Sequence, residues 1–126
     1  MIKKIETGKA PLALGPYSQG VVLDSLIFVF GQVPIDPDSN SLVENDIAIQ
    51  TRQAIKNIEQ ILVSAGSSLE KVLKTTIFIK NMKEFSRVND EYAKFFTGPT
   101  QPARSAVEVS ALPKGALIEI EAIAYL

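Results

Sequence analysis

The sequence DIAIQTRQAIKNIEQILVSAG, residues 46–66, predicts a long amphipathic helix. Its apolar positions recur at spacings of three and four residues, which is the period of one helix face. Gly66 follows as a C-terminal cap, so the helix is expected to run for about five turns. Such a stripe must be buried against another layer of structure. The stripe consists of Ile47, Thr51, Ala54, Ile55, Ile58, Ile61, Leu62 and Ala65.

Segments before and after this helix predict β-strands, because they are apolar, rich in β-branched and aromatic residues, and bounded by turn-forming residues. Asp24-Ser25 separates the first two segments, which favours a hairpin. The predicted strands are Val21–Leu23, Leu26–Val33, Val72–Lys80, Ala103–Val109 and Leu117–Tyr125.

A second helix is predicted after Asn81, which with Glu84 three residues later has the spacing of a capping box. The order of elements is then strands, helix, strand, helix, strands. The economical arrangement is an α+β fold, a single mixed sheet with both helices packed on one face. A chain of 126 residues fits one compact domain, expected to span residues 1–126. The stripe of the second helix consists of Phe85, Val88, Tyr92, Phe95 and Phe96.

The composition excludes several classes of site. With no His and no Cys, the chain cannot form a Ser-His-Asp triad, a thiolate nucleophile, a zinc ribbon or a disulfide framework. The net charge of −1, with both signs scattered, gives no reason to expect a nucleic acid or an anionic membrane as partner. Without a secretory leader or an apolar run long enough to span a bilayer, the sequence predicts a soluble cytoplasmic protein.

Two polar residues break the apolar pattern in ways that suggest a site. Asn89 lies on the apolar stripe of the second helix, where a buried amide must find hydrogen-bond partners. Arg104 begins a strand whose alternation places Arg104, Ala106 and Glu108 on one face. Arg is suited to binding a carboxylate because its fork donates two parallel hydrogen bonds. The alternatives are a structural hydrogen bond from Asn89 to backbone and an ion pair of Arg104 with Glu108 or a final-strand carboxylate.

The final strand places Glu119 and Glu121 together on one face of the sheet. If that face lines a cleft, a partly desolvated Glu can act as general base on a water molecule. The alternative is a solvated face that carries two carboxylates. Two further segments suggest ligand contacts, since Tyr17 lies in a compact loop between two glycines and Gly31 permits close approach of backbone to a ligand.

Four motifs follow one another along the chain: Gly15-Pro16-Tyr17-Ser18-Gln19, Gly31-Gln32-Val33-Pro34, Pro102-Ala103-Arg104-Ser105-x-Val107-Glu108-Val109 and Ile118-Glu119-Ile120-Glu121-Ala122-Ile123-Ala124. Together they closely resemble the reactive intermediate deaminase family. The resemblance extends from about residue 10 to the C-terminus, so it is more specific than a single short pattern. It implies a chorismate-mutase-like fold that assembles as a homotrimer with active sites between subunits.

The resemblance also implies an activity, the hydrolysis of 2-enamine and 2-imine products of pyridoxal-phosphate-dependent dehydratases to 2-oxo acids and ammonia. Both 2-iminobutanoate and 2-iminopropanoate are such substrates. By motif, Arg104 would bind the substrate carboxylate and Glu119 would position the attacking water. The pocket would be lined by Tyr17, Gly31, Asn89 and the backbone of Ala106. An iminium carbon is already electrophilic, so this chemistry needs neither a metal nor a cofactor in the chain.

The chain departs from the family pattern at two positions. Phe30 stands where many members have Ser, and Ala106 stands where they often have Cys. Ala106 preserves the backbone N–H. Phe30 places a large ring at a position expected to face the pocket, which would shrink the site or favour apolar substrate side chains.

A second reading of the sequence is a trimer that binds a 2-oxo acid or regulates a partner without turnover. Such a protein would need Arg104 but not Glu119. Members of such families have also been described as endoribonucleases, but this chain has neither a basic stripe nor a His for that chemistry.

Overall fold

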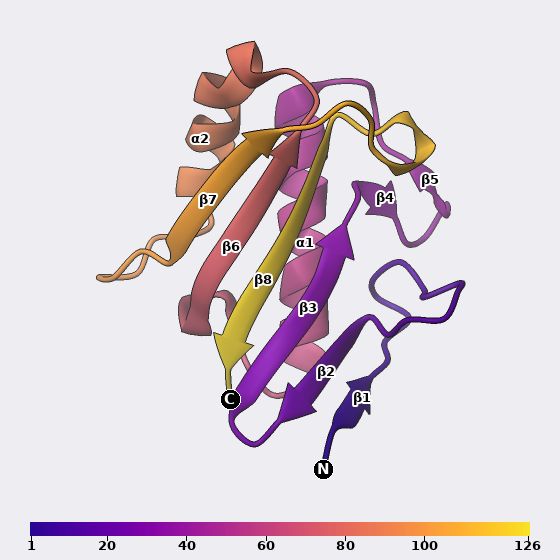
Figure 1. Cartoon of the computed structure of the whole chain (residues 1–126), viewed down its shortest axis with the longest axis vertical. Coiled ribbons are helices and arrows are strands. Elements are labelled where there is room, and N and C mark those ends of the chain that lie inside the picture. Colours follow the sequence, from indigo (N-terminus) through magenta and orange to yellow (C-terminus); the bar gives the residue numbers. More distant parts are fainter.

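The computed structural model describes residues 1–126 and contains a six-stranded mixed sheet with both helices on one face (Figure 1). The strand order is β1-β2-β3-β8-β6-β7, and β6 and β7 are the only parallel neighbours. The α+β prediction is therefore confirmed. The sheet comprises β1 (Lys3–Ile5), β2 (Gly20–Leu23), β3 (Leu26–Gln32), β6 (Val72–Ile79), β7 (Ala103–Glu108) and β8 (Ile118–Tyr125), and a separate ribbon comprises β4 (Ile35–Asp36) and β5 (Ser41–Leu42).

Helix α1 (Ile47–Ser64) is the long helix that the sequence predicts. The Asp46 side chain caps its N-terminus by accepting a hydrogen bond from the Ile49 amide at 2.9 Å. At the other end Gly66 adopts φ +85°, and the Ser67 amide donates to the Leu62 carbonyl. The predicted stripe is buried against the sheet, apart from half-buried Ala65.

Helix α2 (Phe85–Ala93) begins later than the predicted cap. Asn81 instead caps a short 3-10 turn, Met82–Glu84, by accepting a hydrogen bond from the Lys83 amide. Helix α2 packs beside α1, where Glu91 pairs with Arg52 at 3.1 Å. Neither helix is long and apolar enough to cross a membrane.

A β-bulge interrupts the pairing of β3 with β8. Val29 pairs with Ala122 and Gln32 with Ile120, so two residues of β3, Phe30 and Gly31, oppose a single residue of β8. A bulge bends the strand and redirects its side chains. Its consequence here is that Phe30 and Gly31 both lie at the end of the sheet where β8 carries Glu119.

The face of the sheet opposite the helices is uncovered and partly apolar. Side chains such as Ile27 and Ile120 point toward the helices and are fully buried. Their neighbours on the other face include Phe28, Val107 and Tyr125, which remain 41%, 45% and 40% exposed. Lys74, Thr76 and Glu121 lie on the same face, so the surface combines exposed apolar and charged side chains.

The loop before β2 is held by one buried side chain, Gln19. Its Oε1 accepts a hydrogen bond from the Thr7 amide at 2.7 Å, and its Nε2 donates to the carbonyl of Pro11 at 2.7 Å. The Gln19 carbonyl in turn accepts a hydrogen bond from the Phe30 amide. These bonds fix the loop that carries Tyr17 against the bulged end of β3.

We expect Gln19→Leu to lower the free energy of unfolding by about 1–3 kcal/mol, because it leaves buried backbone groups without partners. Urea unfolding measures the loss, and limited proteolysis should show earlier cleavage in the loop of residues 7–19. The matched control is Gln60→Leu, since Gln60 is half-buried on α1. Equal unfolding curves for the two variants would contradict the assigned role of Gln19.

Candidate functional site

Glu119 lies on β8 with its side chain on the uncovered face of the sheet, where alternation predicts it. It is half-buried, whereas Glu121 on the same face is exposed. Burial raises the pKa of Glu119 above its ordinary value, and the nearby charge of Glu121 raises it further. A carboxylate with a raised pKa is a stronger proton acceptor once it is ionised.

Gly31 allows the Glu119 carboxyl group to lie directly on the backbone of β3. A Cβ atom at position 31 would stand 2.8 Å from Cδ of Glu119 and closer still to Oε2. No side chain fits there unless the carboxyl group moves. The close approach expected at Gly31 is therefore made by a carboxylate of the same chain.

Tyr17, Phe30, Gly31 and Glu119 line one cavity of about 370 Å³, here called the Glu119 pocket. The rings of Tyr17 and Phe30 lie with their centroids 5.6 Å apart at an angle of 35°. Most of the remaining wall is apolar, and its polar members are Gln32, Asn40 and Lys114. The structure thus brings together four of the residues predicted from the sequence.

Arg104 lies on β7 at the edge of the sheet, and its guanidinium group packs against α2. The central Cζ atom is 5.0 Å from the centre of the Phe85 ring and 4.8 Å from that of Tyr92. Both distances are typical of cation–π contacts. The alternative ion pair is not formed, because Glu108 accepts a hydrogen bond from the Met82 amide and no carboxylate lies within 4 Å of the Arg104 nitrogens.

Asn89 joins Arg104 in a second depression of about 460 Å³, here called the Arg104 groove. The Asn89 Oδ1 atom is buried and has no hydrogen-bond partner. The alternative, a structural hydrogen bond from Asn89 to backbone, is not seen in the structure. Buried polar atoms are nearly always paired, so an unpaired one beside a groove is a candidate ligand contact.

Ala106 lines neither the Glu119 pocket nor the Arg104 groove. It is half-buried on the same face of β7 as Arg104 and packs against the core. Its strand partner on β6 is Ile77. The contact of the Ala106 backbone with substrate thus stays a prediction.

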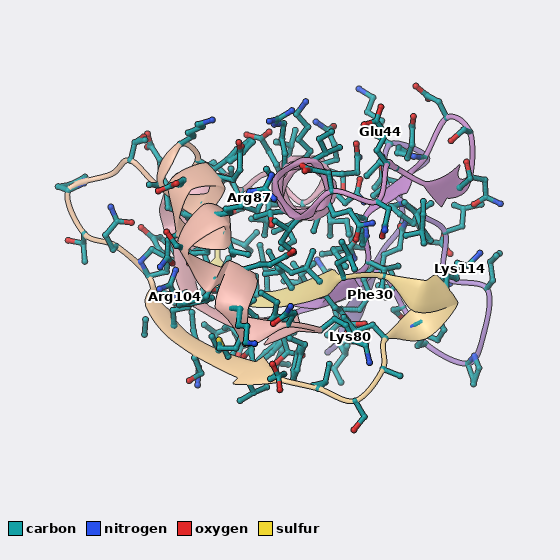
Figure 2. All side chains as sticks on the ribbon, turned by 90° about the horizontal axis from the view of Figure 1, so that it is seen from above. Phe30, Glu44, Lys80, Arg87, Arg104 and Lys114 are labelled. Atoms are coloured by element: carbon teal, nitrogen blue, oxygen red, sulfur yellow. The ribbon has the colours of Figure 1, made fainter.

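One chain does not bring the two groups of predicted residues together. Arg104 is on the helix-covered face of β7, Glu119 is on the uncovered face of β8, and β6 lies between these strands (Figure 1). Figure 2 shows Arg104 beside α2 and Phe30 well to the right of it, in the layer of the sheet below α1. A small substrate cannot touch both groups within a single chain.

Two residues that contact Arg104 were interpreted from the sequence only as core positions. Phe85 and Tyr92 are seven residues apart on α2, with Asn89 between them on the same stripe. The Tyr92 hydroxyl is 2.7 Å from the Thr75 hydroxyl, and burial raises the pKa of Tyr92. The available signal was the position of a polar Asn89 on an aromatic stripe, which pointed to a site but not to the role of its neighbours.

The chain is similar to characterised families along nearly its whole length. A family model described as Endoribonuclease L-PSP matches residues 7–126. The 2-iminobutanoate/2-iminopropanoate deaminase of Salmonella typhimurium is 47% identical over 98% of this chain and 98% of its own. The human protein of that name is 46% identical over 95% of this chain and 87% of its own.

A solved structure from Yersinia pestis, described as a protein of unknown function of the conserved Rid family, superposes with a TM-score of 0.98. It is 55% identical and covers 100% of both chains. These similarities agree with the four motifs read from the sequence and with the mixed sheet and two helices seen here. The chain therefore belongs to the Endoribonuclease L-PSP family, the family of the reactive intermediate deaminases.

Proposed function

We propose that this protein hydrolyses 2-imino acids, in equilibrium with 2-enamino acids, to 2-oxo acids and ammonia. The main observation behind the proposal is that the two charged side chains at the predicted positions, Glu119 and Arg104, form no ion pair. Glu119 is a half-buried carboxylate with a raised pKa, and Arg104 is a guanidinium without an acidic partner. The relatives named 2-iminobutanoate/2-iminopropanoate deaminase support this substrate class.

The chemistry needs a carboxylate anchor and a base. The Arg104 guanidinium binds the substrate carboxylate through two parallel hydrogen bonds, which orients the adjacent C=N carbon. Glu119 accepts a proton from water as the water oxygen bonds to that carbon, and the resulting carbinolamine takes the proton on nitrogen. The C–N bond then breaks as the carbinolamine hydroxyl gives its proton back to Glu119, so ammonia leaves, the 2-oxo acid remains and water is the only co-reactant.

The proposal includes a homotrimer, because one chain holds only half of each site. A head-to-tail contact can place the Arg104 groove of one subunit on the Glu119 pocket of the next, and such contacts close into rings. Each site would then take Arg104 and Asn89 from one subunit and Tyr17, Gly31 and Glu119 from its neighbour. The uncovered apolar face of the sheet supplies surface for this assembly. The cytoplasmic location expected from the sequence belongs to the same proposal.

Phe30 makes the site apolar where the substrate side chain would lie. Its ring packs near Tyr17 and borders the same pocket as Glu119. A pocket walled by rings favours substrates with apolar side chains over those with hydroxyl groups. Iminobutanoate, which carries one more methylene than iminopropanoate, is accordingly the better of the two substrates.

The experiment that tests the activity is a coupled assay in which a dehydratase generates iminobutanoate and 2-oxo acid release is timed. We expect wild-type protein to accelerate release. Arg104→Lys should lower kcat/KM by about ten- to several-hundredfold, since Lys keeps the charge but loses the two-bond fork. The melting temperature should stay near that of wild type. Normal turnover by folded Arg104→Lys protein would rule out Arg104 as the carboxylate anchor, and no acceleration by wild type would favour a binding protein without turnover.

Shared sites can be tested by mixing subunits. Arg104→Ala and Glu119→Gln should each be inactive alone. Co-expression in equal amounts should restore about a quarter of the wild-type number of active sites. In a random mixture each site has a one-half chance of an intact Arg104 and a one-half chance of an intact Glu119 from the neighbouring subunit. The control mixture is Arg104→Ala with Asn89→Ala, which damage the same half and should give no new activity. Mixed trimers that show no recovery, with their mass verified by light scattering, would contradict the shared site.

The close contact of the Glu119 carboxyl group with the backbone at Gly31 can be tested by Gly31→Ala. The added methyl group displaces the carboxyl group, so kcat/KM should fall by about ten- to a hundredfold. The acid limb of the pH profile should move to lower pH, because a displaced, better-solvated Glu119 has a lower pKa. Adding Glu119→Asp, whose side chain is one methylene shorter, should recover part of the activity.

Gly8→Ala is the matched control for this series, because a Cβ at Gly8 meets nothing within 4 Å. It should leave kcat/KM and the pH profile unchanged. A Gly31→Ala protein with an unchanged pH profile would show that the position of the Glu119 carboxyl group does not depend on the contact at Gly31.

A further inference from the structure

The Arg104 side chain is held by aromatic faces and not by a counter-ion. Its guanidinium centre lies 5.0 Å from the Phe85 ring centre and 4.8 Å from the Tyr92 ring centre. No side chain or backbone oxygen accepts a hydrogen bond from it, and it belongs to none of the four ion pairs in the chain. The aromatic pair is thus the principal contact that fixes this long side chain on an edge strand.

The two rings are themselves fixed. The hydroxyl group of Tyr92 is hydrogen-bonded to the Thr75 hydroxyl on β6 at 2.7 Å, in a buried position. The Tyr92 ring also stacks on Phe96, with centroids 4.3 Å apart. Phe85 is half-buried at the first turn of α2 and packs against the core. The rings of Phe85 and Tyr92 are therefore held in place before any ligand binds.

Contact with ring faces leaves the N–H groups of the guanidinium free to donate hydrogen bonds, whereas an ion pair does not. An acidic partner would occupy the N–H groups of the guanidinium and neutralise its charge. A ring face attracts the cation through its quadrupole and leaves the N–H groups at the edge free to donate. The unpaired Asn89 Oδ1 lies on the same stripe between the two rings.

We propose that Phe85 and Tyr92 are positioning residues that hold Arg104 in the orientation in which it binds a substrate carboxylate. The inference rests on the proposed function, in which Arg104 is the anchor. The aromatic pair restricts the flexible side chain in advance, so binding does not have to order it. A purely structural role, in which the rings only attach β7 to α2, would change stability but not affinity for a carboxylate.

The test is Phe85→Leu, which keeps an apolar side chain of similar length and removes the ring face. The probe is 2-oxobutanoate, measured by calorimetry on the assembled protein. We expect Kd to rise about three- to thirtyfold, the range of one cation–π contact. KM for iminobutanoate should rise in parallel while kcat changes less, because the carboxylate is bound in both the ground and transition states.

Two controls separate positioning from packing. Phe85→Tyr keeps the ring face and should retain wild-type affinity. Phe95→Leu makes the same substitution at a half-buried ring just after α2, one that does not contact Arg104, and should lower the melting temperature without changing Kd. If Phe85→Leu behaves like Phe95→Leu in both measurements, the inference is overturned.

A double mutant distinguishes failure of this inference from failure of the proposed function. With Arg104→Lys present, Phe85→Leu should cause a smaller further loss than it does alone, because both changes disturb one interaction. Fully additive losses would contradict positioning through Arg104 while leaving Arg104 as the anchor. Normal 2-oxobutanoate binding by Arg104→Lys alone would instead overturn the proposed function.

Discussion

Two helices cover one face of a six-stranded sheet and leave the other face open, and the location of every candidate site residue follows from this arrangement. The stripe of α1 is buried against the inward face of β3 and β8. Side chains alternate along each strand, so each strand offers half of its residues to the helices and half to the open face. Arg104 belongs to the first set and Glu119 to the second. The fold therefore separates a cation and a carboxylate that would neutralise each other if they met in one chain.

This separation explains why neither Glu119 nor Arg104 forms an ion pair within the chain. Glu119 contacts the backbone at Gly31 and forms no ion pair, and burial together with the charge of Glu121 raises its pKa. Arg104 rests on two rings that attract it without occupying its N–H groups. A half-buried carboxylate in a pocket with a raised pKa is a candidate functional group, and Arg104 beside the unpaired Asn89 Oδ1 is a candidate binding group. In the proposed homotrimer, the Arg104 guanidinium of one subunit would lie near the Glu119 carboxylate of the next subunit.

The bulge in β3 gives the Glu119 pocket its shape. Without the extra residue, alternation would place Phe30 and Gly31 on opposite faces, and only one of them could approach Glu119. With the bulge, Gly31 supports the carboxyl group and the Phe30 ring borders the same pocket. The Gln19 hydrogen bonds then hold the Tyr17 loop across it. The large ring at Phe30 is thus accommodated by backbone geometry, and the pocket that remains is apolar.

Local patterns in the sequence were sufficient for the helix at residues 46–66, the α+β class and the shared face of Glu119 and Glu121, because period and alternation depend on neighbours in the chain. They missed the strands β1, β4 and β5, which are too short to show a period and form only by pairing with other segments. They could not show the bulge at Phe30 and Gly31, which depends on the register between β3 and β8, strands about ninety residues apart in the chain. Nor could they decide whether Arg104 pairs with Glu108 or packs on Phe85 and Tyr92, because spacing permits both and only the packing of α2 on β7 selects one. The unpaired Asn89 Oδ1 and the separation of Arg104 from Glu119 were decided by the tertiary structure in the same way, since both depend on which distant surfaces the folded chain brings together and which it keeps apart.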